Sequence, residues 1–207
     1  MRQEFLEAIP AVTVRMRREN MDKEIRDPWV DVKTYHGFSG DQVISALQKE
    51  IRRGNTENAV LLAYEMVITS PAMENYLWQR LMVISVEDIG FGRLEAPILV
   101  NSLHQMIQSF DRNLGERKLF AVHAVRYLCN CQKDRSSDEM ILWIKMASEK
   151  MDMIPEIPDY ALDMHTKRGK ELGRGIRHFI EVGTQLSPEL VDRDLTYKHR
   201  ITEILDS

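Results

Sequence analysis

The chain has 207 residues, of which 43% are apolar and 29% are charged, and its formal net charge is −4 at pH 7. This composition is typical of a soluble globular protein with one sizeable core, and it excludes wholesale disorder. The acidic balance gives no overall electrostatic case for a dedicated nucleic-acid binder, because such proteins usually carry a basic excess. Only local basic patches remain as candidates for that role.

The first 32 residues predict an amphipathic N-terminal arm, because apolar side chains recur there at helical spacing and a basic group follows them. Those side chains are Phe5, Leu6, Ile9, Val12 and Met16, with Arg15, Arg17 and Arg18 as the basic group. Residues 21–40 are typical of turns and loops, so we place a boundary there. The predicted organisation is an arm at 1–32, a helical domain at 33–184 and a helical tail at 185–207.

From Ser39 onward the apolar residues follow the helical period. Ser39 is a candidate N-cap for a helix that ends at Gly54, and the next helix begins at Asn55 or Thr56. Its residues 59–68 are apolar almost all round, so we expect it to be central. Further helices are predicted from Ser70-Pro71, over 94–110, after Gly115 and from Ser136 or Ser137. No segment alternates like a strand, and the prediction is an all-α multi-helix bundle.

The most apolar of these helices ends in a small polar group within residues 77–90. Its stripe consists of Leu77, Leu81, Ile84 and Asp88, and apolar side chains cover most of its circumference, so other helices should wrap it. Glu87 and Asp88 fall in the last turn, where the helix dipole disfavours negative charge. We therefore expect them to pair with or cap neighbouring helices, with a catalytic use as the alternative.

Cys129 and Cys131 lie two positions apart in an apolar helical run and point to different sides, which predicts reduced thiols. With no second cysteine pair, the spacing does not fit a structural zinc site. No apolar stretch approaches the roughly 20 residues that span a bilayer, and residues 1–5 lack a signal-peptide pattern. We expect a cytoplasmic protein without a membrane contact and without a cofactor or bound metal.

The chain contains no phosphate-binding loop, no H-E-x-x-H and no G-x-S-x-G sequence, so we do not expect nucleotide hydrolysis by this chain alone. Residues 159–179 form the densest polar segment, with three possible interpretations. Asp163, His165 and His178 would form a metal or general-base site, whereas basic side chains would form an anion-binding strip around flexible glycines. That strip comprises Lys167, Arg168, Lys170, Arg174 and Arg177. The favoured interpretation is a packed loop and helix with solvated basic residues. His104 and His123 lie on apolar helices, which predicts core or interface positions.

Three segments together resemble the C-terminal region of the RarA/MgsA family of bacterial clamp-loader-like AAA+ ATPases. They are residues 44–54, with a serine-alanine-leucine start and a basic end, the alanine-rich residues 58–66, and residues 80–90, which end in Ser-Val-Glu-Asp-Ile-Gly. The likeness continues through residues 121–128 and 170–175, and it covers roughly residues 33–180. The ATPase domains of the family are missing from this chain.

The resemblance implies an all-helical collar domain, which in that family holds the subunits together as a tetramer in replication and repair of DNA. It implies a non-enzymatic, self-associating scaffold or accessory factor. Ser85, Glu87, Asp88 and Gly90 would then maintain the collar architecture. Basic side chains would contact DNA or partner proteins, namely Arg52, Arg53, Lys167, Arg168, Arg174 and Arg177. The alternatives are a metal-dependent enzyme using Asp163, His165 and His178, and a module on the same fold that binds a partner or small molecule.

Overall fold

The computed structural model describes residues 27–207, so the predicted N-terminal arm with Arg15, Arg17 and Arg18 lies outside the described residues. Between residues 27 and 207 the regular structure is helical, apart from an isolated antiparallel bridge between Lys33 and Ser39. The predicted all-α fold is confirmed. In this described part, no helix is long and apolar enough to cross a membrane.

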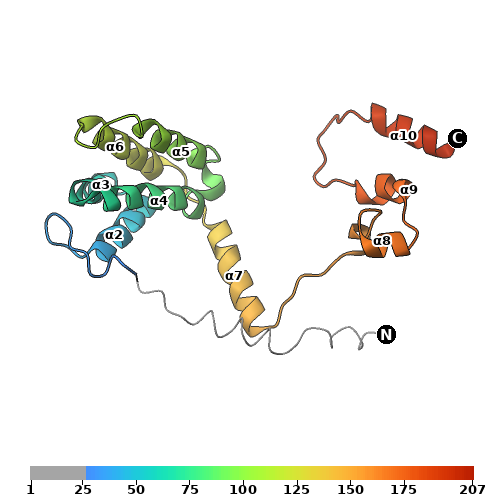
Figure 1. The fold of residues 1–207 in the computed structure, drawn as a ribbon, viewed down its shortest axis with the longest axis horizontal. Coiled ribbons are helices and arrows are strands. Elements are labelled where there is room, and N and C mark those ends of the chain that lie inside the picture. Colours follow the sequence, from blue (N-terminus) through green and yellow to red (C-terminus); the bar gives the residue numbers. More distant parts are fainter. Residues whose placement is uncertain (1–26) are drawn as a thin grey trace. The chain divides into compact units, whose positions relative to one another are not determined.

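The chain divides into two compact units, one that ends at Ile144 and one that comprises Lys145–Ser207. The predicted limits of the collar-like domain, at residues 33 and 184, stay predictions. The first unit contains α2 (Gly40–Arg53), α3 (Thr56–Thr69), α4 (Pro71–Glu87), the short turn η2 (Gly90–Gly92), α5 (Ala96–Ile107) and α6 (Gly115–Asn130) (Figure 1). Helix α7 (Ser136–Lys150) contains the division between the units.

The ends of these helices follow from local sequence. Ser70 has an extended backbone, and its hydroxyl accepts a hydrogen bond from the backbone N–H of Met73 at 3.1 Å, while Pro71 occupies the first turn, where its missing N–H costs nothing. Gly54 ends α2 with a φ of 75°, a left-handed conformation that glycine adopts without strain. The start of α4 and the end of α2 therefore lie where the sequence predicted. Helix α5 (Ala96–Ile107) is shorter than the predicted 94–110, and Ser39 precedes α2 without a side-chain capping hydrogen bond.

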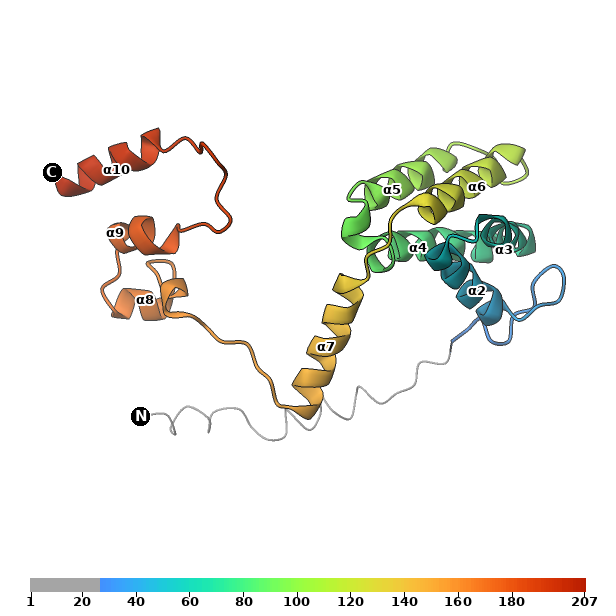
Figure 2. The same ribbon diagram turned by 180° about the vertical axis from the view of Figure 1, so that it is seen from behind.

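The core of the first unit is built around α4, which contacts α2, α3, α5 and α6 (Figure 2). Its side chains Leu77, Trp78, Leu81 and Ile84 are fully buried, so the predicted stripe faces the core. Burial of each of these large apolar side chains stabilises the unit by roughly 1.5–3 kcal/mol.

Both apolar helices keep an exposed strip. Val83 and Val86 of α4 are 41% and 54% exposed, so the helices that surround α4 leave part of it uncovered. Helix α3 lies centrally, as predicted, because it contacts α2, α4 and α6, but its Leu61 and Tyr64 are 61% and 43% exposed. Hydrophobicity alone does not distinguish burial in the core from exposure at a surface that another molecule covers.

The second unit contains the turn η3 (Asp159–Ala161), α8 (Lys167–Glu171), α9 (Ile176–His178), the π-helical turn η4 (Phe179–Gly183) and α10 (Thr196–Asp206). Thr166 caps α8, since its hydroxyl accepts from the backbone N–H of Gly169 at 2.9 Å. Gly169 is buried, and a Cβ there would lie 1.8 Å from the carbonyl oxygen of Asp163. Glycine is therefore required for the close contact between α8 and the preceding turn.

Candidate functional site

Asp88, at the C-terminal end of α4, is fully buried and accepts three side-chain hydrogen bonds. Its Oδ1 accepts from Arg52 Nε at 2.5 Å and from Arg135 Nη1 at 2.6 Å, and its Oδ2 accepts from Gln48 Nε2 at 2.9 Å. A buried carboxylate needs such partners, because desolvation of an unpaired charge is costly. The charge that the helix dipole disfavours is thus compensated by residues from α2 and from the segment before α7.

Glu87 shares the same partners and completes what we call the carboxylate network, formed by Glu87, Asp88, Gln48, Arg52 and Arg135. Its Oε1 accepts from Gln48 at 2.7 Å and from both arginines at 3.3 Å. Burial opposes the charge of Arg135, but its hydrogen bonds to Asp88 and Glu87 outweigh this effect and raise its pKa above the ordinary value. Arg135 also pairs with Asp138, and Arg80 donates to Gln48, so each charge of the network faces an opposite charge or a polar partner.

The glycines after Asp88 allow the chain to pack directly on the segment between α6 and α7. Gly90 has a φ of 49°, and a Cβ there would lie 2.5 Å from the carbonyl oxygen of Asp134. The backbone N–H of Phe91 donates to Asp134 Oδ2 at 3.1 Å, and the N–H of Asp134 donates to the Asp88 carbonyl at 3.0 Å. Ser85 is buried nearby in α4, and its hydroxyl donates to the Met82 carbonyl at 2.6 Å.

These contacts describe the surroundings of Ser85, Glu87, Asp88 and Gly90, whose role in maintaining the architecture stays a prediction. All four lie where α4 meets the segment before α7. The test is to substitute these side chains and measure the free energy of unfolding, because a contact does not by itself give its energy.

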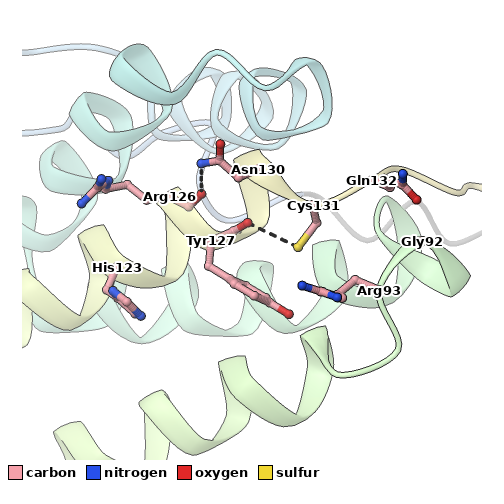
Figure 3. Close-up of a pocket in the computed structure, with 8 residues that line it drawn as sticks. All are labelled: Gly92, Arg93, His123, Arg126, Tyr127, Asn130, Cys131 and Gln132. Carbon is pink, nitrogen blue, oxygen red and sulfur yellow. Dashed lines mark hydrogen bonds between the residues drawn. The ribbon is translucent and has the colours of Figure 1, made fainter.

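A cavity of about 600 Å³ lies beside this junction, between the chain after η2 and one face of α6. It is lined by Gly92, Arg93, His123, Arg126, Tyr127, Asn130, Cys131 and Gln132. Figure 3 shows the Arg93 side chain reaching toward the hydroxyl of Tyr127, with His123 on the same side of α6. The Arg126 side chain extends away from Arg93 in this view. We call this cavity the Arg93 pocket.

The polar groups of the Arg93 pocket are mostly hydrogen-bond donors. Burial raises the pKa of the Tyr127 phenol, and the neighbouring Cys131 raises it further, while Arg93 has a smaller opposing effect. The phenol therefore stays protonated at neutral pH and is able to donate. None of the described residues that line the pocket carries a carboxylate. Such a lining favours a negatively charged ligand.

Sequence reasoning missed the Arg93 pocket. His123 was predicted as a core or interface residue; it is exposed on the pocket wall, so it is not in the core, and the interface alternative stays a prediction. The available signal was the spacing of His123, Arg126, Tyr127 and Asn130, which places polar groups on one face of an otherwise apolar helix. Arg93 had no such signal, because it comes from a turn that is distant in sequence. Cys129 and Cys131 are free thiols, as predicted.

The predicted DNA or partner contacts are distributed over both units and differ in availability. Arg52 is held by the carboxylate network, whereas Arg53 is exposed and, among residues 27–207, donates only to the backbone carbonyl of Lys49 at 3.3 Å. In the second unit, Lys167 is exposed and Arg168 forms an exposed pair with Glu171 at 3.4 Å. Among these, Arg53, Lys167 and Arg168 remain the most accessible cations.

The other two predicted contacts, Arg174 and Arg177, are engaged within the second unit. Arg174 donates to both carboxylate oxygens of Asp159, at 2.8 Å to Oδ1 and 2.7 Å to Oδ2. It also donates to the Leu162 carbonyl at 2.9 Å. Arg177 pairs with Asp206 at 2.8 Å and Glu181 at 3.2 Å. These ion pairs connect segments within the unit, so contact with DNA would compete with them.

Asp163 and His165 form a local turn. Asp163 Oδ1 accepts from the backbone N–H of His165 at 2.9 Å, and Oδ2 lies 3.1 Å from His165 Nδ1. The hydrogen bonds from the His165 side chain and backbone hold the pKa of Asp163 below its ordinary value. Within residues 27–207, no group of three or more potential metal ligands is close enough to hold an ion, so His178 does not complete a site with this pair.

No family model matches the chain, and no curated protein matches it. The resemblance to the RarA/MgsA collar therefore depends on the sequence segments described above. The function has to be argued from the surfaces that the structure presents.

Proposed function

We propose that the protein is a non-enzymatic, self-associating helical scaffold similar to the RarA/MgsA collar, and that α7 is its main contact helix. In this proposal it serves as an accessory factor in DNA replication or repair, for which a partner supplies the ATPase. The observation that supports self-association best is the exposed apolar surface of α7.

Helix α7 has large apolar side chains that remain accessible on every side. Five consecutive residues and one further on are 44–61% exposed, namely Met140, Ile141, Leu142, Trp143, Ile144 and Met146. Five consecutive positions extend around the whole circumference of a helix, so a single neighbouring surface cannot bury them all. A contiguous exposed apolar surface of this kind marks a site of protein–protein contact.

A groove between α4 and α7 extends this apolar surface within the first unit. Met82, Val83 and Val86 form one wall and Ile141 forms the other, around a cavity of about 480 Å³. Val83 and Val86 are the residues of α4 that the surrounding helices leave exposed. A side chain inserted from another helix would bury them, which accounts for their hydrophobicity.

The charges of α7 favour a second copy of this helix as the occupant. In its first turn Asp138 already pairs with Arg135, so the exposed Glu139 carries the available negative charge, while Lys145 and Lys150 give the second half a net positive charge despite Glu149. Two antiparallel copies place the acidic end of each helix beside the basic half of the other. This is the reciprocal arrangement of a two-fold interface, in which both copies use the same surface.

A charge introduced into the middle of α7 tests this proposal. We expect Trp143→Glu to shift the protein from an oligomer to a monomer in sedimentation-velocity ultracentrifugation, because burial of a carboxylate at an apolar interface is costly. Leu61→Glu is the matched control, since Leu61 is as exposed as the α7 residues but lies on α3. Equal sedimentation of the Trp143 variant and the wild type would contradict the proposed role of α7.

The DNA-related part of the proposal requires a separate test. Charge reversal of the three most accessible cations, Arg53→Glu, Lys167→Glu and Arg168→Glu, should weaken binding to a DNA duplex and reduce its salt dependence. Fluorescence anisotropy at two salt concentrations measures both quantities. Unchanged affinity in all three variants would exclude these residues as DNA contacts.

A further inference from the structure

Two arginines beside the Arg93 pocket differ from the other arginines around the core of the first unit. Arg52, Arg117 and Arg135 each have a carboxylate oxygen within 2.5–2.7 Å. The only carboxylate paired with Arg93 among the described residues is Glu95, at 3.9 Å, and both side chains are more than half exposed. Arg126 has no described carboxylate within ion-pair distance. The positive charge at this cavity is therefore largely uncompensated.

The donors of the pocket come from two different segments, and Arg93 and the Tyr127 hydroxyl lie close together while His123 lies farther along α6. Arg93 follows η2, whereas His123 and Tyr127 lie one turn apart on α6 (Figure 3). The planar guanidinium offers several N–H groups, the phenol offers an O–H group and the imidazole offers an N–H group. A tetrahedral oxyanion has enough acceptor oxygens for donors that arrive from these different directions.

The backbone that positions Arg93 is fixed by close packing. Gly92 lies against the segment after α6, and a Cβ there would be 2.5 Å from the Gln132 carbonyl oxygen. Lys133 holds the end of α6, since its Nζ donates to the carbonyls of Leu128, Cys129 and Cys131 at 2.9, 3.0 and 2.5 Å. The backbone around the pocket is therefore already ordered. A ligand would not have to order it, so binding costs less conformational entropy.

We propose that the Arg93 pocket binds the phosphate group of a small molecule, with Arg93 and Tyr127 as the donors to the phosphate, His123 as a contact for the rest of the molecule and Arg126 at the edge. This inference is independent of the proposed self-association through α7. The cavity of about 600 Å³ falls within the range of small-molecule sites, about 300–1,000 Å³, and is larger than a free phosphate ion requires. The additional space and the Tyr127 ring fit an organic phosphate of nucleotide size.

Isothermal titration calorimetry of the full chain with inorganic phosphate and with adenosine monophosphate, at constant ionic strength, tests the site. We expect Arg93→Ala to weaken binding roughly tenfold to hundredfold, as for loss of charged hydrogen bonds. Arg93→Lys should have an intermediate affinity, because it keeps the charge without the planar fork. Tyr127→Phe removes only the hydroxyl and should weaken binding severalfold. Lys49→Ala removes one exposed positive charge on α2 and serves as the control.

Tighter binding of the nucleotide than of inorganic phosphate would support an organic phosphate as the ligand, and equal binding would support the free ion. The proposal is overturned if neither compound binds the wild type. It is also overturned if Arg93→Ala binds like the wild type, or if Lys49→Ala loses as much affinity as Arg93→Ala. Because Arg93 is 59% exposed, its variants should fold, and circular dichroism checks this directly.

Discussion

Substitution of Asp88 by asparagine tests the energetic role of the carboxylate network. The change keeps the shape of the side chain, removes its charge and replaces one acceptor oxygen with an NH₂ donor. In the native protein Oδ1 accepts from Arg52 and Arg135, and Oδ2 accepts from Gln48. In either orientation of the new amide, at least one donor would face another donor.

The expected loss of stability follows from the burial of the groups involved. Removal of one partner from a fully buried ion pair costs about 3–5 kcal/mol. Asp88 is fully buried, but Arg52 and Arg135 are 30% and 29% exposed, and Glu87 still provides one negative charge. We therefore expect a smaller loss of about 2–3 kcal/mol. At about 4 °C per kcal/mol, the melting temperature should fall by roughly 8–12 °C.

Urea unfolding at pH 7, followed by circular dichroism, measures this loss. Glu57→Gln is the control, because Glu57 is an exposed carboxylate on α3, and its substitution should change the unfolding free energy by no more than about 0.5 kcal/mol. A loss for Asp88→Asn as small as that of the control would refute the reasoning. It would mean that water replaces the network without a net cost.

Two further substitutions test other contacts. Glu65 accepts from the His36 backbone at 2.8 Å, and although burial opposes its ionisation, hydrogen bonds from His36 and Thr34 lower its pKa below the ordinary 4.5. Ionised Glu65 therefore stabilises the fold above pH 4.5, and this contribution is lost as the pH falls through the lower folded-state pKa. Urea unfolding should thus show that Glu65→Gln is less stable than the wild type at pH 7 and that the difference decreases toward pH 3. A difference in stability that does not change with pH would contradict the stabilising role of ionised Glu65. Gly169→Ala should disrupt α8, because its Cβ would lie 1.8 Å from the Asp163 carbonyl oxygen. Amide hydrogen exchange should increase at residues 163–171, and unchanged protection there would contradict the packing described.

The helices were predictable because their signals are local. Ser70-Pro71 and Gly54 determine helix ends through the hydrogen bonds and dihedral angles of neighbouring residues, which a single sequence displays. The exposure of Val86 and Leu61 was not predictable in the same way. An apolar residue indicates that its side chain is covered from water. The residue type does not show whether the chain itself or another molecule covers it.

The site was predictable only in part, because its partners are distant in sequence. The unfavourable dipole position of Asp88 predicted that ion pairs would be needed, but its partners Arg52 and Arg135 are 36 and 47 residues away. The Arg93 pocket was missed for the same reason, since its cation and its phenol come from separate segments. Such a juxtaposition depends on how α4, α5 and α6 pack, which no short motif encodes.

The mass of the full chain in solution tests the central claim most directly. Light scattering coupled to size exclusion, at low and high salt and over a range of concentrations, gives that mass without a reference shape. The proposal predicts a stable multiple of the 24.2 kDa chain mass, and four copies would match the collar that the sequence resembles. The oligomer should persist in high salt, because burial of apolar surface is not screened. A mass of 24.2 kDa under all conditions would contradict the claim that α7 joins copies of this protein.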